Sequence, residues 1–227
     1  AVTITKSASA DLTGIDLYQH RIILRHEDVF QMSIADMKAY DKTGDTDIPF
    51  TAATGSIPYT LTTDPDNQLW VWNSKTFIPG GNITLNSGGS GQTYDGSIIL
   101  SANSTFTAQG TESHSLGGGF TANAGATFTA ASSTWNFTAT TTGKSIIGVA
   151  PLTFWRMNFS GASGGWVVNQ ALTVGENFLP SAGTVSGTSN VTVNGTTTAG
   201  TGSIAMTGGT FTLANGGTFG GNNNWSF

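Results

Sequence analysis

Three carboxylates lie within seven residues at Asp41, Asp45 and Asp47, with Gly44 between them. Carboxylate and backbone carbonyl oxygens are the ligands that Ca²⁺ takes in proteins. The spacing differs from that of an EF-hand loop, whose acids stand at the first, third and fifth positions. Two interpretations therefore stay open: a Ca²⁺ site, and a solvated turn in which the aspartates bond their own backbone.

A second carboxylate pair, Asp64 and Asp66, has the composition that glycoside hydrolysis needs, because two acids must flank the bond that is cleaved. Pro65 between them indicates a turn. After Asp95 the chain carries only two more acids, Glu112 and Glu176, too few for an acidic cleft on a long repeat. The carboxylates do not predict a catalytic pair.

Two further catalytic patterns are incomplete. Residues 161–165 (GASGG) match a nucleophile elbow, but that site needs a later histidine and the last histidine is His114. His26-Glu27 begins like a zinc-protease helix, yet Phe30 stands where the second histidine would have to project. We therefore expect no enzyme.

Six tryptophans can either fill a core or stack on sugar rings. Trp135, Trp155 and Trp225 stand in alternating strand-like segments, which favours the core. Trp70 and Trp72 share one face of a strand whose other face carries Leu69 and Val71. Two interpretations therefore stay open for them: burial under a neighbouring part of the chain, and contact with a ligand. Trp70 and Trp72 are the candidate ligand-binding residues.

Composition narrows the class of partner. Charged residues make up 9% of the 227-residue chain and the formal net charge is −5, without a basic cluster, which argues against a nucleic-acid partner. No apolar run is long enough to predict a transmembrane segment. The chain has no cysteine, so disulfides and thiolate metal sites are excluded.

The acids divide the chain into two regions, because eleven of the thirteen lie at or before Asp95. We expect a more charged β region over residues 1–80 and a Thr/Gly-rich region of repeats over 81–227, with the first region continuous with the second or capping it. Residues 33–40 can form a short helix capped by Ser33. The second region alternates apolar residues with Thr, Ser or Asn in short segments separated by Gly or Asn, which predicts strands of three to five residues.

An internal repeat supports a stacked array. Residues 120–128 (FTANAGATF) lead to the triplet WNF at 135–137, and residues 211–219 (FTLANGGTF) lead to WSF at 225–227. Such arrays bury the apolar face of one unit against the next. The sequence therefore predicts an all-β parallel β-helix or solenoid, with Phe120, Phe128, Phe211 and Phe219 inward at equivalent positions.

Residues 70–85 (WVWNSKTFIPGGNITL), 137–146 (FTATTTGKSI), 154–159 (FWRMNF) and 164–168 (GGWVV) resemble the Thr/Gly/Asn-rich repeats of large secreted surface proteins from candidate-phyla, Parcubacteria-like bacteria. The resemblance covers about residues 69–227. It implies surface exposure and a structural or adhesive role, and it supplies no catalytic residues.

The leading functional expectation is a non-catalytic structural or adhesive repeat protein, extracellular or at the cell surface. One alternative is a self-assembling filament or appendage subunit that pairs copies by β-strand addition. Another is a glycan-binding or glycan-cleaving β-helix module. Expected partners are further copies of the chain or cell-surface glycans, and Ca²⁺ is the one cofactor considered.

Overall fold

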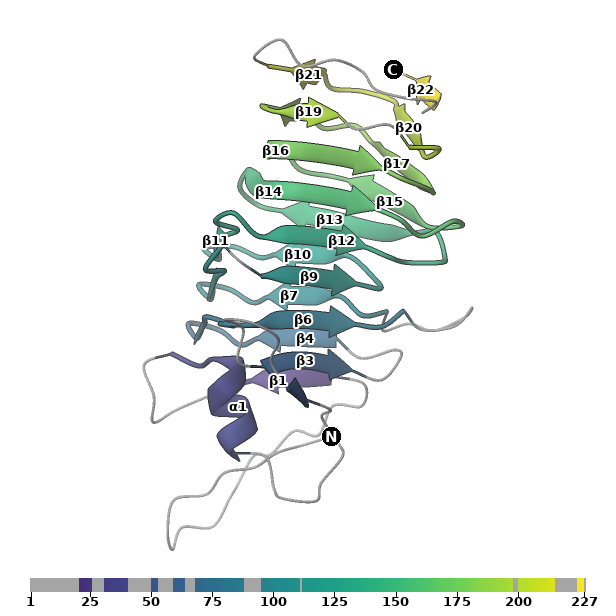
Figure 1. Cartoon of the computed structure of the whole chain (residues 1–227). Coiled ribbons are helices and arrows are strands. Elements are labelled where there is room, and N and C mark those ends of the chain that lie inside the picture. The colour runs from purple at the N-terminus through teal and green to yellow at the C-terminus, as the bar shows by residue number, and fades with distance from the viewer. Residues whose placement is uncertain are drawn as a thin grey trace, which may run out of the picture.

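The computed structural model describes residues 21–25, 31–40, 50–52, 59–63, 68–87, 95–110, 112–197, 200–214 and 224–226. Within these ranges the chain is a parallel β-solenoid with one short helix. Figure 1 shows the strands stacked as successive coils from the N-terminal to the C-terminal end. The β-solenoid predicted from the sequence is confirmed.

Sheet A is nine-stranded and parallel, and each of its strands comes from a different coil. In spatial order its strands are β1 (Arg21–Leu24), β4 (Gln68–Val71), β7 (Ile98–Leu100), β10 (Phe120–Ala122), β13 (Lys144–Gly148), β15 (Gly165–Val168), β17 (Thr184–Gly187), β20 (Ser203–Met206) and β22 (Asn224–Ser226).

Sheet C is ten-stranded, and among its described pairings β2 with β3 is antiparallel while the rest are parallel. Its strands are β2 (Phe50–Ala52), β3 (Tyr59–Thr63), β6 (Asn82–Leu85), β9 (Ser113–Leu116), β12 (Thr134–Phe137), β14 (Leu152–Phe159), β16 (Leu172–Pro180), β18 (Val191–Val193) and β21 (Phe211–Leu213), with β19 (Thr196–Thr197) also pairing with β16. Sheet B is a smaller parallel sheet of β5 (Thr76–Phe77), β8 (Thr105–Thr107) and β11 (Thr127–Thr129).

The coils shorten toward the C-terminus. Hydrogen bonds between neighbouring coils mostly join residues 22 or 23 positions apart in the middle of the solenoid. From β15 onward they mostly join residues 19 or 20 positions apart. Near residue 80, β3 pairs with β6 and β4 with β7, so sheets A and C run across the position at which the two sequence regions were divided.

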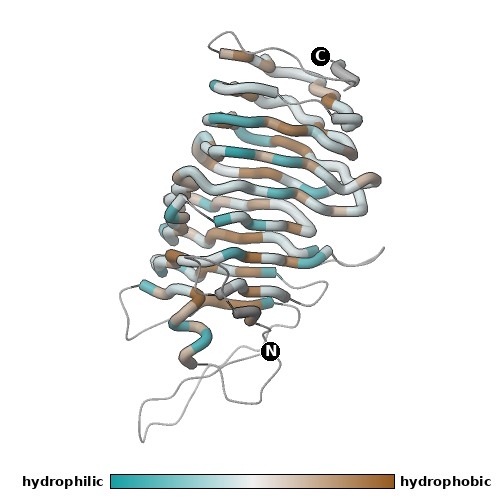
Figure 2. Tube along the Cα trace, in the orientation of Figure 1, coloured by the Kyte–Doolittle hydropathy of each residue, from teal (hydrophilic) through white to brown (hydrophobic). Residues whose placement is uncertain are grey.

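The core is a set of inward rows, because side chains alternate between the two faces of each strand and strands stack in register. One row of sheet A contains Leu69, Ile98, Phe120, Ile146 and Val168, all fully buried. Figure 2 shows hydrophobic positions recurring on successive coils. Each buried side chain therefore packs against its counterparts in the coils before and after it.

Helix α1 (Ile34–Tyr40) lies beside the first coils and contacts β3. Ser33 Oγ accepts a hydrogen bond from the Asp36 N–H at 3.1 Å, and Asp36 Oδ2 accepts one from the Ser33 N–H at 2.8 Å. This reciprocal pair satisfies backbone donors at the first turn. Ile34 and Met37 bury one side of the helix, so the helix predicted over residues 33–40 is confirmed.

The predicted equivalence of the two long repeats is wrong. Phe120 lies in sheet A, and the register through Ile146, Val168 and Gly187 places Met206, not Phe211, above it four coils later. Phe211 lies in sheet C instead. The two copies begin 211 − 120 = 91 residues apart, whereas the four coils from Phe120 to Met206 span 206 − 120 = 86 residues, so the second copy falls on a different sheet.

The other phenylalanines that were predicted to lie inward at equivalent positions do not form one equivalent set either. Phe128 points inward from sheet B and is partly buried, and Phe211 is also partly buried. Phe219 lies outside the described residues.

Candidate functional site

The proposed metal ligands Asp41, Asp45 and Asp47 lie outside the residues that the structure describes, as do Asp64 and Asp66. Among the described residues, no three His, Cys, Asp or Glu side chains lie close enough together to hold a metal ion. Within the same ranges, no helix has the length and apolarity needed to span a membrane.

Leu69 and Val71, which alternate with the two tryptophans along the chain, are fully buried. Trp70 and Trp72 therefore project from the outer face of sheet A. The Arg21 guanidinium lies over the Trp70 ring, 4.3 Å from its centroid. The Trp70 indole N–H donates to Gln68 Oε1 at 3.0 Å. Side chains of the chain itself thus occupy one face and the polar edge of Trp70.

The cation–π contact of Trp72 is longer than that of Trp70. Trp72 is partly exposed, and the Arg25 guanidinium lies 6.0 Å from its ring centroid, at the outer limit for a cation–π contact. Trp70 and Trp72 are thus both partly exposed, and the cation–π contact is the closer one at Trp70.

Trp155, predicted to be in the core, is exposed at 36% of its surface, so that prediction is wrong. Strict alternation would place Trp155 on the same side as Met157 and Phe159, which are buried. The ladder between β14 and β16 shifts register between Phe154 and Arg156, so Phe154 takes the inward position and Trp155 points outward.

The Trp155 indole lies against Gly175 in the next coil, where any side chain would collide with the ring. The sequence did contain a signal for this outward placement. Phe154 and Trp155 are successive aromatic residues, and alternation along a strand cannot send both inward.

Two other tryptophans lie inside. Trp135 and Trp166 are both fully buried, which confirms the core assignment of Trp135. Trp225 lies in β22 of sheet A, and its side chain lies outside the described part of the chain.

Amide and hydroxyl side chains form a ladder on the outer face of sheet C, and one of them, Asn158, lies in the same strand as Trp155. Asn158 Nδ2 donates to Asn136 Oδ1 at 3.2 Å, and the Ser181 hydroxyl donates to Asn158 Oδ1 at 2.7 Å. Asn136 Nδ2 in turn lies 3.1 Å from Ser113 Oγ. The ladder joins four coils and presents neutral donors and acceptors at the coil spacing.

A rank of threonines runs along the same sheet. Thr153, Thr173, Thr192 and Thr212 are in register in β14, β16, β18 and β21. Their neighbours in the strands, such as Leu172 and Val174, are buried, so the hydroxyls point outward. Strand spacing places successive hydroxyls about 4.8 Å apart.

Charge is nearly absent from this part of the surface. Beyond Glu112 the formally charged side chains are Lys144, Arg156 and Glu176. Arg156 and Glu176 form an ion pair with each side chain 44% exposed, and Lys144 is paired with Asp95 in the interior. The outer faces of these coils therefore offer aromatic, amide and hydroxyl groups with little net charge.

Besides Lys144 and Asp95, two further titratable groups of the described residues are buried in the middle coils. Glu112 accepts hydrogen bonds from the N–H groups of Gln109 and Gly110, both at 2.7 Å, and so caps that turn. His114 is fully buried, and neither of its ring nitrogens has a hydrogen-bond partner among the described residues. Burial lowers the pKa of His114 to about 3, so its imidazole is neutral and inaccessible to a substrate.

The turn that resembles a nucleophile elbow is a strand-to-strand turn. The Gly164 N–H donates to Gly161 O at 2.9 Å, and β15 begins directly after it. A nucleophile elbow needs a helix at this position. Residues 161–165 thus lack the context of a serine hydrolase.

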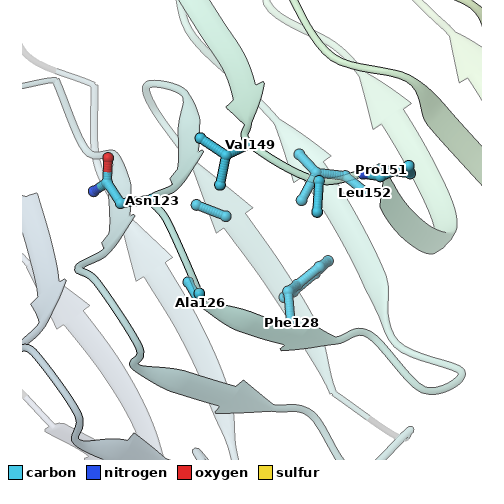
Figure 3. Close-up of a pocket in the computed structure, with 9 residues that line it drawn as sticks. Asn123, Ala126, Phe128, Val149, Pro151 and Leu152 are labelled. Atoms are coloured by element: carbon cyan, nitrogen blue, oxygen red, sulfur yellow. The ribbon is translucent and has the colours of Figure 1, made fainter.

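A small apolar hollow lies where sheet B ends at β11 (Figure 3). It encloses about 150 Å³ between Phe128 and the segment of Val149, Pro151 and Leu152. Val149 at its rim is 67% exposed. The volume is small for an organic ligand, since ligand pockets usually exceed about 300 Å³.

Comparison with protein-family models, with curated proteins and with solved structures gives no match.

Proposed function

We propose that the chain is an extracellular, non-catalytic adhesive and structural module, and that the outer face of sheet C contacts neutral, hydroxyl-rich glycans on a cell surface. The solenoid supplies a rigid support, because its coils are joined by continuous backbone ladders. The outward rows supply the contacts.

The observation that carries this proposal is the placement of Trp155. An exposed indole lies against Gly175, and the same strand, β14, carries Asn158 of the amide ladder. Aromatic faces pack on the apolar faces of sugar rings, whereas amides and hydroxyls bond the ring hydroxyls. An aromatic surface next to regularly spaced amides fits a polymer whose units repeat.

The low charge of the same surface supports a neutral partner. The exposed ion pair of Arg156 with Glu176 carries no net charge. Binding that depends on stacking and hydrogen bonds should change little with salt, since ionic screening acts on charges.

A retention assay tests the proposal. Purified protein is mixed with insoluble cellulose and with insoluble chitin at low and high salt, and labelled protein is applied to a glycan array. We expect retention on at least one neutral glycan at both salt concentrations. Trp155→Ala should weaken retention about tenfold, which corresponds to about 1.4 kcal/mol.

Trp70→Ala is the matched control, because the Trp70 ring is already covered by Arg21. If Trp70→Ala abolishes retention while Trp155→Ala keeps it, the glycan contacts sheet A, which contradicts the proposed face. Failure to bind any glycan, together with regular filaments in electron microscopy, would replace adhesion by the appendage alternative.

A further inference from the structure

Lys144 occupies an inward position of sheet A. Its register partners in the following coils are Trp166, Val185 and Ile204, which are all buried. The Lys144 side chain is itself only 9% exposed. An amine therefore stands in a row that is otherwise apolar.

The partner of Lys144 is Asp95, which precedes β7 and is 8% exposed. Lys144 Nζ is in direct contact with Asp95 Oδ2. Since β10 lies between β7 and β13 in sheet A, the contact joins two coils that are not neighbours. The other carboxylate oxygen, Asp95 Oδ1, is buried without a hydrogen-bond partner among the described residues.

Glycine at position 118 lets the intervening coil pack closely against the backbone of Asp95. A side chain at Gly118 would collide with Asp95 O and with Ser97 Oγ. The Trp166 indole N–H donates to Gly118 O at 3.2 Å, so this ring lies against the same segment. The pair is thus enclosed by backbone and by an aromatic side chain.

The enclosure favours condensation of the two groups. A buried ion pair is costly unless its remaining polar atoms are satisfied, and Asp95 Oδ1 is not satisfied within the described part of the chain. Burial lowers the pKa of Lys144, which favours the neutral amine, the form that is nucleophilic. Transfer of one proton from Lys144 to Asp95 produces an amine facing a carboxylic acid.

We propose that Lys144 and Asp95 form an intramolecular amide cross-link inside the solenoid. The Nζ lone pair attacks Asp95 Cγ, the N–C bond forms, and a carboxyl oxygen leaves as water with two protons that came from the ammonium group. The ammonium and the carboxylate together contain every atom of the amide and the water, so no oxidant, metal or further reactant is needed. Both buried charges disappear.

The cross-link would tie the coil of β7 to the coil of β13 across the coil of β10. It would provide a covalent closure in a chain that has no cysteine. This inference is independent of the proposed glycan contact, because it concerns the interior of sheet A.

Intact mass spectrometry of the purified chain tests the proposal directly. We expect the unmodified sequence mass less one water, and a branched peptide joining Lys144 to Asp95 after proteolysis. Asp95→Ala and Lys144→Arg should each restore the full sequence mass. Asp95→Asn should lose ammonia in place of water, because an amide side chain has a different leaving group.

Arg156→Lys is the matched control. It places a lysine opposite Glu176 in an exposed ion pair and should retain the loss of one water without adding a second. A wild-type protein that has the β-rich circular dichroism of a folded solenoid and the full sequence mass would overturn the proposal. So would a water loss that maps to residues other than Lys144 and Asp95.

Discussion

The imidazole of His114 packs against the indole of Trp135, with the ring centroids 4.5 Å apart, in neighbouring strands of sheet C. His114 is the only histidine within the described residues and its ring nitrogens have no partners there. A neutral imidazole suits this apolar row, but an imidazolium does not.

Acid should therefore destabilise the protein through His114. The folded-state pKa is about 3 and the ordinary value is 6.5, so between these values the unfolded chain binds a proton that the folded chain excludes. Stability is consequently lost as pH falls from 6.5 toward 3. We expect a loss of about 3 kcal/mol from this group between pH 7 and pH 4, at about 1.36 kcal/mol per pKa unit.

Urea denaturation of wild type and His114→Leu at both pH values measures this contribution. The variant should lack that part of the pH dependence and gain about 1 kcal/mol at pH 7, because a partnerless polar group is replaced by an apolar one. Parallel pH profiles for the two proteins would show that His114 is hydrogen-bonded or accessible in solution.

Removing Trp135 should cost about 3–5 kcal/mol in Trp135→Ala, the range for emptying a large buried aromatic site. Trp135 contacts rings from several coils, with centroids 5.6 Å away at Phe106, 5.7 Å at Phe120 and 5.4 Å at Phe154. Thr138→Ala, just beyond the same strand, should change stability by less than about 0.5 kcal/mol. Equal losses in denaturant melts would contradict the inward orientation of Trp135.

The amide ladder should contribute to stability as well as to the outer surface. Asn158→Ala removes the hydrogen bonds to Asn136 and Ser181 and should lower the free energy of unfolding by about 1 kcal/mol. Asn169→Ala is the control, since Asn169 is an exposed residue at the end of β15. If thermal melts show the same small effect in both variants, the ladder is not maintained in solution.

Calcium is tested at Asp41, Asp45 and Asp47 by chelation. If these carboxylates bind Ca²⁺, a chelator should lower the melting temperature of the wild type, because a ligand that binds only the folded state stabilises it. Asp45→Ala should abolish the difference between chelated and calcium-loaded protein. If chelation does not change the melting temperature, the segment is the solvated turn and not a Ca²⁺ site.

The sequence by itself predicted the architecture and much of the inside-outside pattern. Alternation within a strand is local, so Leu69 and Val71 could be assigned to one face and Trp70 and Trp72 to the other. Ser33 likewise marked the start of α1, because capping depends on residues that are close in sequence.

Only the tertiary structure decided which residues stack on one another in successive coils. Register between coils depends on coil length, and the coils shorten from 22 or 23 residues to 19 or 20. A repeat spacing read along the sequence therefore could not place Phe120 and Phe211. Nor could it show that a register shift after Phe154 leaves Trp155 outward.

The same reason applies to the buried polar groups. Lys144 and Asp95 are far apart in the sequence, and no pattern in either segment pairs them. They meet because β7, β10 and β13 stack in sheet A and because glycine at position 118 lets the intervening coil pack closely against the backbone of Asp95. Local sequence determined most of the residues that face inward, with Trp155 as an exception, whereas long-range stacking of the coils decided which of them touch.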